Sequence, residues 1–287
     1  MRRALKQLMV CVLFLSGCTP EPHQPGVIQK WAVYYDDKIP AKKFKHMDLV
    51  VFDRTHYPHF ERLKGETIVL GYVSAGEIND RMPEKQQLEE DKALLFHQDH
   101  WQSSAVDLTS PRWQALVLDA VDDAAEKGFD GVMLDTIESP LYWAKTKAPE
   151  RYDAMKDAAI QLIGDIRAAH PDMKIMVNRA FEVLPAVASK IDYELAESIM
   201  SDTDVSTGHS VLFPPHTYGE VAEQLQHAQS ISPGLKIFTL DYWNPDDVNG
   251  LARIYEAQRG AGFIPYVTTI DLRNFTPEPD AARVHRK

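Results

Sequence analysis

Cysteine is scarce in this 287-residue sequence, which contains only Cys11 and Cys18. Beyond residue 18, the chain therefore has no thiol for a disulfide, a cysteine nucleophile or a cysteine metal site. Without disulfides, the fold must depend on a large apolar core. The length and the 44% share of hydrophobic residues suffice for a single domain of the barrel size class.

Basic residues and phosphate-binding motifs are also few. The chain has 31 Lys and Arg against 42 Asp and Glu, which gives a net charge of -11. Nucleic acid is not expected as a partner, because phosphate binding requires a basic face. The glycine-rich dinucleotide fingerprint and the phosphate-binding loop are absent, and no Ser lies in a nucleophile elbow. We therefore expect no cofactor.

Histidines are not clustered in the way that a catalytic metal requires. A hydrolytic metal site on a barrel normally needs several histidine ligands. The nearest candidates are His56 and His59, but Pro58 lies between them and disrupts regular spacing. We predict that these are surface histidines and that the chain has no metal site.

The first residues have the features of an export signal. Three basic residues precede an apolar stretch at 8–15, which is shorter than the about 20 residues needed to cross a bilayer. Residues 15–18 read Leu-Ser-Gly-Cys, which is typical of a bacterial lipobox. We expect residues 1–17 to be a lipoprotein signal peptide, Cys18 to carry the lipid, and residues 18–29 to form a tether. An ordinary signal peptide with an incidental cysteine is the alternative.

This signal predicts a protein held at a membrane by its N-terminal lipid. We expect it in the bacterial cell envelope. Thr19 and Pro20 carry no acidic retention signal, so the outer membrane is the favoured place. The tether favours a monomer.

Short apolar runs alternate with helix-length amphipathic segments along the rest of the chain. The runs are Trp31–Tyr35, Asp48–Asp53, Thr67–Ser74, Gly131–Asp135, Lys174–Asn178, Tyr193–Glu197, Lys236–Tyr242 and Gly262–Thr269. Strand–helix alternation predicts a parallel sheet. Eight runs in one domain favour a single (β/α)8 TIM barrel, of class α/β, over an open doubly wound sheet. We place this barrel at residues 30–275 and a frayed C-terminal tail at 276–287.

Three helices between these runs have clear ends. One spans 111–127 after Ser110, a capping residue, and ends at a glycine. The others span 149–170 and 245–259. The irregular stretch 76–107 is expected to hold a helix at 83–93 and an insertion over the barrel mouth.

Polar side chains follow nearly every predicted strand. In a barrel, the C-terminal ends of all strands meet at one face, where active sites are built. The residues delivered to that face include Tyr35, Asp53, Glu77, Asp135, Asn178, Glu197, Asp241, Tyr242 and Tyr266. An Asp after a strand can merely cap the next helix. Five carboxylates on one rim repel one another, however, and such clusters usually bind a cation or transfer protons.

Two carboxylates and several aromatic residues fit glycoside hydrolysis. That reaction needs a pair of acids flanking an oxocarbenium-like transition state. Aromatic rings near the predicted rim could support sugar rings, although aromatics at strand ends are also common packing residues. They are Tyr34, Tyr35, Tyr72, Trp143, Tyr242, Trp243 and Tyr266. A metal-assisted deacetylase is the weaker alternative, because the strand ends supply no convergent ligand set.

The order of these segments resembles glycoside hydrolase family 114, the endo-α-1,4-polygalactosaminidase-like proteins. The matching segments are WAVYY at 31–35, DLVVFD at 48–53, GYVSAGE at 71–77, VDL at 106–108, FDGVMLDTIES at 129–139, VN at 177–178, AES at 196–198, LDY at 240–242 and GFIPY at 262–266. One departure is Glu138-Ser139, where the family pattern usually reads Asp-Ser.

The resemblance implies a barrel hydrolase acting on α-1,4-linked galactosamine or N-acetylgalactosamine polymers, including exopolysaccharides of the Pel type. It implies a retaining mechanism in which Asp135 is the nucleophile and Glu197 the general acid/base. The remaining rim residues would bind the amino-sugar chain: Tyr35, Asp53, Glu77, Asn178, Asp241, Tyr242 and Tyr266. A non-catalytic carbohydrate-binding lipoprotein with the same barrel is the alternative function.

Overall fold

The structure is a computed structural model that describes residues 27–279. The expected signal peptide, Cys18 and most of the tether lie outside the described residues, as does the end of the tail. Within residues 27–279, no helix is long and apolar enough to span a membrane.

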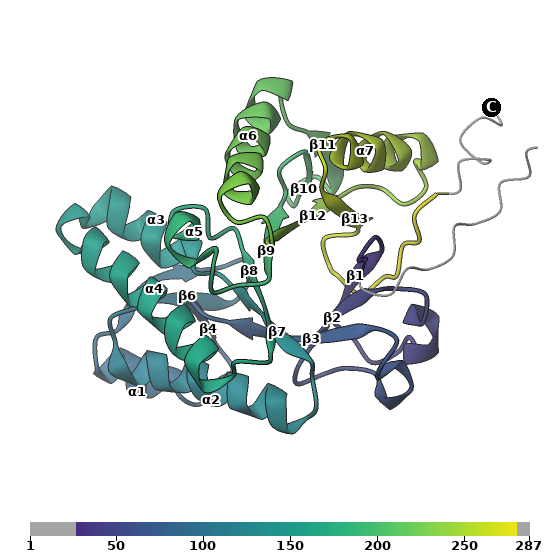
Figure 1. Ribbon diagram of the computed structural model, residues 1–287. Coiled ribbons are helices and arrows are strands. Elements are labelled where there is room, and N and C mark those ends of the chain that lie inside the picture. The colour runs from purple at the N-terminus through teal and green to yellow at the C-terminus, as the bar shows by residue number, and fades with distance from the viewer. Residues whose placement is uncertain (1–26, 280–287) are drawn as a thin grey trace, which may run out of the picture.

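Eight parallel strands form the predicted barrel (Figure 1). They are β1 (Trp31–Tyr34), β2 (Leu49–Asp53), β3 (Ile68–Ser74), β7 (Gly131–Asp135), β8 (Lys174–Asn178), β9 (Tyr193–Glu197), β12 (Lys236–Tyr242) and β13 (Ile264–Thr268). Each strand pairs with the next one in this order, from β1 to β13. At the remaining seam, the Trp31 indole N–H donates to the Ile264 carbonyl at 2.9 Å. The barrel is therefore nearly closed, and the predicted fold class is confirmed.

Helices surround the strands unevenly. They are α1 (Lys85–Glu90), α2 (Pro111–Glu126), α3 (Glu138–Lys147), α4 (Tyr152–Ala169), α5 (Leu184–Val187), α6 (Pro215–Ile231) and α7 (Val248–Gly260). Only 3-10 turns, η1 (Ala41–Phe44) and η2 (Glu61–Leu63), follow β1 and β2, and η3 (Pro149–Arg151) precedes α4. The prediction found α2, α4, α7 and the short α1, but it missed α3, α5 and α6. The Ser110 hydroxyl caps α2 by accepting from the Trp113 amide, as its position before Pro111 predicts.

Two small antiparallel sheets are inserted into the barrel. The first consists of β4 (Glu77–Asn79), β5 (Leu94–Gln98) and β6 (Ser103–Val106), with β6 in the centre. The second is a hairpin of β10 (Ser201–Asp204) and β11 (His209–Leu212). The insertion at 76–107 was expected, but its strands were not, because β4 and β6 are short and largely polar and β5 lacks a clear apolar alternation.

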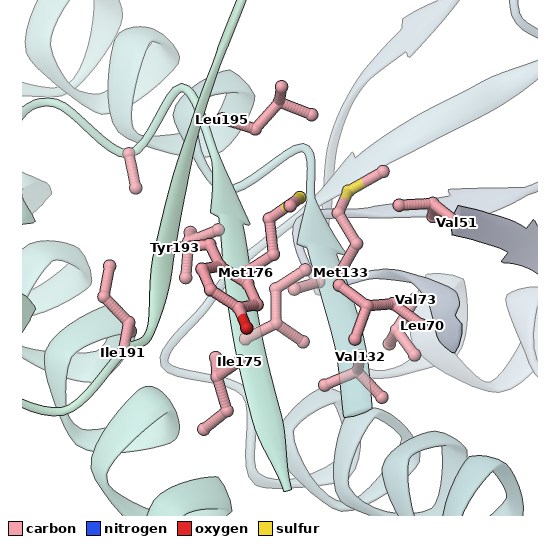
Figure 2. Close-up of a cluster of buried hydrophobic side chains, with 14 of the residues drawn as sticks. Val51, Leu70, Val73, Val132, Met133, Ile175, Met176, Ile191, Tyr193 and Leu195 are labelled. Carbon is pink, nitrogen blue, oxygen red and sulfur yellow. The ribbon is translucent and has the colours of Figure 1, made fainter. Parts of the chain in front are cut away.

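The barrel interior determines which strand residues reach the mouth. Met133 of β7 and Met176 of β8 are register partners, and Figure 2 shows their side chains within the same buried cluster. Side chains two residues apart in a strand share a face. Asp135 and Asn178 lie two residues after Met133 and Met176, at the C-terminal ends of their strands. Their side chains therefore face the barrel interior as well.

The residues after β13 pack against the barrel beyond the point at which the sequence predicted a frayed tail. The Phe275 ring lies 5.0 Å from that of Phe44, centroid to centroid. Thr276 is buried, and its amide donates to the Tyr266 hydroxyl at 3.2 Å. Arg259 forms an ion pair with Glu278 at 2.6 Å. We expected fraying from 276, but these contacts hold the chain to Glu278.

Candidate active site

One amide joins the two predicted catalytic acids. The Asn178 side-chain nitrogen donates to Asp135 Oδ1 at 2.8 Å and to Glu197 Oε2 at 2.5 Å. The two carboxylate oxygens can therefore lie no farther apart than the sum of these distances. The Tyr242 hydroxyl donates to the other oxygen, Glu197 Oε1. Four side chains from β7, β8, β9 and β12 thus form one hydrogen-bonded group.

Burial and mutual repulsion alter the acidity of this pair. Burial, together with the negative charge of Asp135, raises the pKa of Glu197 to about 6, although hydrogen bonds from Tyr242 and Asn178 oppose the shift. Burial also raises the pKa of Asp135, against hydrogen bonds from Asn178 and Tyr72. Close to neutral pH, Glu197 can therefore exchange a proton.

Two tyrosines extend the site toward β1 and β3. The rings of Tyr35 and Tyr72 lie 5.0 Å apart in an edge-to-face arrangement. Burial raises the pKa of both hydroxyls well above the usual range, and the Asp135 charge adds to the shift. Asp53 also acts on Tyr35, while its own oxygen accepts from the Thr55 amide at 2.7 Å. Tyr35 therefore lies within reach of the charges of both catalytic acids, and Asp53 lies beside Tyr35.

The inserted sheet brings Glu77 to the same region. Its side chain is buried and accepts from the Ser103 hydroxyl at 2.5 Å. Its charge contributes to the raised pKa of Asp135. Glu77 therefore lies near the acid pair, as predicted. One of its carboxylate oxygens is already hydrogen-bonded within the inserted sheet, to Ser103.

The backbone is unusual immediately after three site residues. Thr136, Arg179 and Ser198 follow Asp135, Asn178 and Glu197, and their φ angles are 68°, 51° and 51°. This left-handed region is rare for residues other than glycine, and a β-branched residue such as Thr136 is a clear outlier. Such strain tends to gather where the surrounding structure fixes functional groups.

Gly76 fixes the turn after Asp135. Its amide donates to the Thr136 hydroxyl at 3.0 Å, and an added Cβ would lie 2.0 Å from the Thr136 carbonyl oxygen. No side chain fits at that distance, so the insertion can press against the end of β7 only through a glycine.

Two predicted site residues lie outside the group. Asp241 accepts from the Met200 and Ser201 amides at 2.9 and 2.8 Å, and from the Gln258 side chain at 2.6 Å. Because Tyr242 points inward, Asp241 points outward, toward α7. The Tyr266 hydroxyl is occupied by the Thr276 amide. The structure thus brings Asp241 and Tyr266 into the packing of the barrel, not into the mouth.

The sequence analysis did not assign two residues beside the site, Glu138 and Arg179. Arg179 donates to the main-chain oxygen of Glu197 at 2.9 Å, and its Nε lies 4.0 Å from Glu138 Oε1. Burial and the Asp135 charge raise the pKa of Glu138 to about 8. The sequence signal for Glu138 was its departure from the family pattern, which usually has Asp at this position. Nothing in the sequence distinguished Arg179.

His56 lies close to two acids. Its Nε2 lies 3.5 Å from Asp36 and 3.4 Å from Asp37. Among the described residues, this is the one group with a metal-like geometry. The Lys38 ammonium already pairs with Asp36 at 2.8 Å and lowers its pKa, so a cation would have to displace a partner.

Comparison with known proteins identifies a family for this chain. The sequence profile of glycoside-hydrolase family GH114 matches residues 16–285. An uncharacterized protein of Thermotoga maritima is 27% identical over 169 residues, which is 56% of this chain and 51% of that protein. One of Deinococcus radiodurans is 27% identical over 163 residues, 55% of this chain and 48% of that protein. The matches span about half the length of these relatives.

Solved structures share the fold. The glycoside hydrolase domain of PelA from Pseudomonas aeruginosa superposes with a TM-score of 0.77 at 22% identity, covering 88% of this chain and 99% of that one. Aspergillus fumigatus Ega3, solved as a complex with galactosamine, gives 0.60 at 19% identity, covering 90% and 97%. At sequence identities of 22% and 19%, these comparisons show a shared fold alone.

Proposed function

Since the chain belongs to glycoside hydrolase family GH114, we propose that it is a glycosidase that cleaves α-1,4-linked galactosamine or N-acetylgalactosamine polysaccharide. The observation that carries the proposal is the Asn178 amide shared by Asp135 and Glu197. A retaining glycosidase needs carboxylates about 5–5.5 Å apart, and the two hydrogen bonds limit the oxygens to that separation or less. An inverting pair needs a wider gap to admit water.

Asp135 is the nucleophile in this mechanism. Its carboxylate attacks the anomeric carbon, and the glycosidic C–O bond breaks as a bond to Asp135 forms. Hydrogen bonds from Asn178 and Tyr72 favour the ionised form, which is the form that attacks.

Glu197 is the general acid and then the general base. Its proton passes to the leaving oxygen in the first step. In the second step, ionised Glu197 takes a proton from water, which attacks the anomeric carbon and releases Asp135. The raised pKa of Glu197 suits both roles near neutral pH.

The substrate class rests on the family and on its structural neighbours. Ega3 has been solved with galactosamine. A rim of acids that includes Asp53 and Glu77 would attract a partly cationic polymer. We further propose that a lipid on Cys18 holds the enzyme at the cell envelope, where such polymers occur.

The test is product release from partially deacetylated α-1,4-galactosaminan by the wild type and by Glu197→Gln. The proposal predicts oligosaccharides from the wild type and none from the variant. Retained binding to the polymer without products from either protein would instead identify a non-catalytic carbohydrate-binding protein.

A further inference from the structure

The inserted sheet of β4, β5 and β6 carries an exposed tryptophan at one of its turns. Residues 99–102 join β5 to β6, and Trp101 in this turn is 55% exposed. Met82, which follows β4, is exposed as well. Single exposed hydrophobic side chains are common on proteins, so exposure alone assigns no role to Trp101. The rigidity of the turn and its position relative to the acid pair are the stronger evidence.

Several hydrogen bonds fix the conformation of this turn. The Gln102 side chain donates to the Asp99 carbonyl at 2.6 Å, and the Gln102 carbonyl accepts from the Asp80 amide at 2.9 Å. Gln102 has a φ of 50°, which is uncommon for a residue other than glycine. The His97 ring lies 2.9 Å from a carboxylate oxygen of Asp80 and 2.9 Å from one of Asp99. Because the turn is held in one conformation, a ligand that binds to it loses little affinity to ordering the chain.

The ion pairs of His97 support the turn from one face of the inserted sheet. His97 is the register partner of Ser104, and residues directly opposite each other share a face. Ser103 is the neighbour of Ser104 in β6, so it points to the other face, where its hydroxyl donates to Glu77 at 2.5 Å. The sheet therefore has its supporting ion pairs on one face and Glu77 on the other.

Glu77 and Ser103 connect the turn to the acid pair. The Glu77 charge contributes to the raised pKa of Asp135, so Glu77 lies beside the catalytic pair. Trp101 is two residues before Ser103 in the chain, and two residues span at most about 7 Å. A polysaccharide that leaves the acid pair along Glu77 would therefore meet Trp101 beyond the sugars at the scissile bond.

The surroundings of Trp101 favour contact with an uncharged surface. Asp80 pairs with Lys85 at 2.6 Å and with His97, which also pairs with Asp99, so both acids near the turn have a cationic partner. The His100 ring packs edge-on against the indole, with 4.5 Å between the ring centroids, and restricts its rotation. A fixed indole offers a large apolar face, which suits the C–H face of a sugar ring.

Resting on the glycosidase activity proposed above, we propose that Trp101 is a platform for a sugar unit remote from the scissile bond. The indole packs against the C–H face of a sugar ring in the same polysaccharide chain that the acid pair cleaves. This contact involves neither the amine nor the acetyl group, so it adds affinity for long chains whatever their acetylation. Trp101 therefore makes the enzyme favour the polymer over short oligosaccharides.

The test measures kcat and KM on partially deacetylated α-1,4-galactosaminan and on the shortest oligosaccharide of it that the wild type cleaves. The full-length wild type is compared with Trp101→Ala and Trp101→Phe. On the polymer, Trp101→Ala should raise KM at least about fivefold with little change in kcat, because a stacking surface is lost. Trp101→Phe keeps a ring and should raise KM less. On the short oligosaccharide, which ends before Trp101, both constants should stay at their wild-type values.

Ile231→Ala is the matched control. Ile231 is 62% exposed and ends α6, shortly before β12 begins at the opposite end of the barrel. Removing this exposed apolar side chain should leave kcat and KM unchanged on both substrates. An equal rise in KM on both substrates for Trp101→Ala, or no rise on the polymer, overturns the platform and leaves the glycosidase standing.

A binding measurement separates the platform from the glycosidase activity. In Glu197→Gln, polymer that covers Trp101 should shift the tryptophan emission to shorter wavelength, because the exposed indole loses its water. Adding Trp101→Phe leaves the other four of the five tryptophans in place and should remove that shift. A shift that depends on Trp101 supports the platform even if the wild type cleaves neither substrate, a result that overturns the glycosidase alone. The same emission change in both proteins, or none in either, overturns the platform.

Discussion

The inner and outer faces of the same barrel strands carry buried acids that are satisfied in different ways. On the inner face, Asp135 and Glu197 share a single amide donor and repel each other. On the outer face, Asp241 receives three donors, two of them from the main chain. An acid with a full set of fixed donors holds the structure together. Burial raises the pKa of Asp241 to about 6, as it does for Glu197, so the raised pKa does not distinguish the two faces. What distinguishes the inner face is that two acids lie together and share one donor there, an arrangement suited to proton transfer.

Adjacent residues show the contrast most directly. Asp241 and Tyr242 are consecutive on β12, yet Asp241 contacts Gln258 of α7 and Tyr242 contacts Glu197 across the barrel. The pleat of the strand separates them. Substitutions on the two faces should therefore affect different quantities: activity inside and stability outside.

The largest effect is expected from the inner pair. Asp135→Asn and Glu197→Gln should each lower kcat by roughly 10²–10⁴-fold, because each removes a group that reacts. Both swaps are nearly isosteric and remove a repelling buried charge, so the free energy of unfolding should not fall. Activity assays with urea unfolding of both variants check this. Full activity in either variant would remove that residue from the mechanism.

The next largest effect is expected from the outer face. Asp241→Ala should lower the free energy of unfolding by about 2–4 kcal/mol, because three buried donors lose their acceptor. Asp241→Asn keeps one oxygen and should lose less. Denaturant titration measures both, with kcat/KM determined under native conditions. A catalytic loss as large as that of Glu197→Gln, at unchanged stability, would place Asp241 in the active site.

A smaller effect should appear in the pH profile. The pKa of Glu197 is about 6, so the protonated acid is present below that pH and is lost as the pH rises. The Tyr242 hydroxyl stabilises the ionised form, and Tyr242→Phe should therefore raise this pKa. We expect the falling limb of kcat/KM to move to higher pH by about one unit. A shift of this limb to lower pH would contradict a hydrogen bond from Tyr242 to ionised Glu197.

The smallest effect is expected at Tyr266. Tyr266→Phe removes the acceptor for the Thr276 amide while leaving the ring packed on Trp31. It should cost about 1 kcal/mol of stability and leave kcat/KM unchanged. Thermal unfolding measures the change in stability, and the activity assay measures kcat/KM. A clear rise in KM would restore Tyr266 as a substrate-binding residue.

The sequence predicts the strands better than it predicts which way their side chains face. The eight apolar runs identify the barrel because buried parallel strands are apolar on both faces. For the same reason, no alternation shows that Asp241 faces out and Tyr242 faces in. Asp135, Asn178 and Glu197 were correctly placed together, because they end adjacent strands.

The rest of the site depends on features that the sequence does not encode locally. Glu138 lies on α3, a helix that was not foreseen, and its environment is created by Asp135 and Arg179. The left-handed backbone at Thr136 is imposed by contacts with Gly76 and Ser74 from distant parts of the chain. Such tertiary contacts override local preference.

The stereochemistry of cleavage tests the central claim most directly. NMR spectra are recorded during the first minutes of hydrolysis of an α-1,4-linked galactosamine oligosaccharide, before the released anomers equilibrate. The close pairing of Asp135 and Glu197 through Asn178 predicts that the α-anomer appears first. The β-anomer appearing first would show inversion, and it would contradict the assignment of Asp135 as a nucleophile.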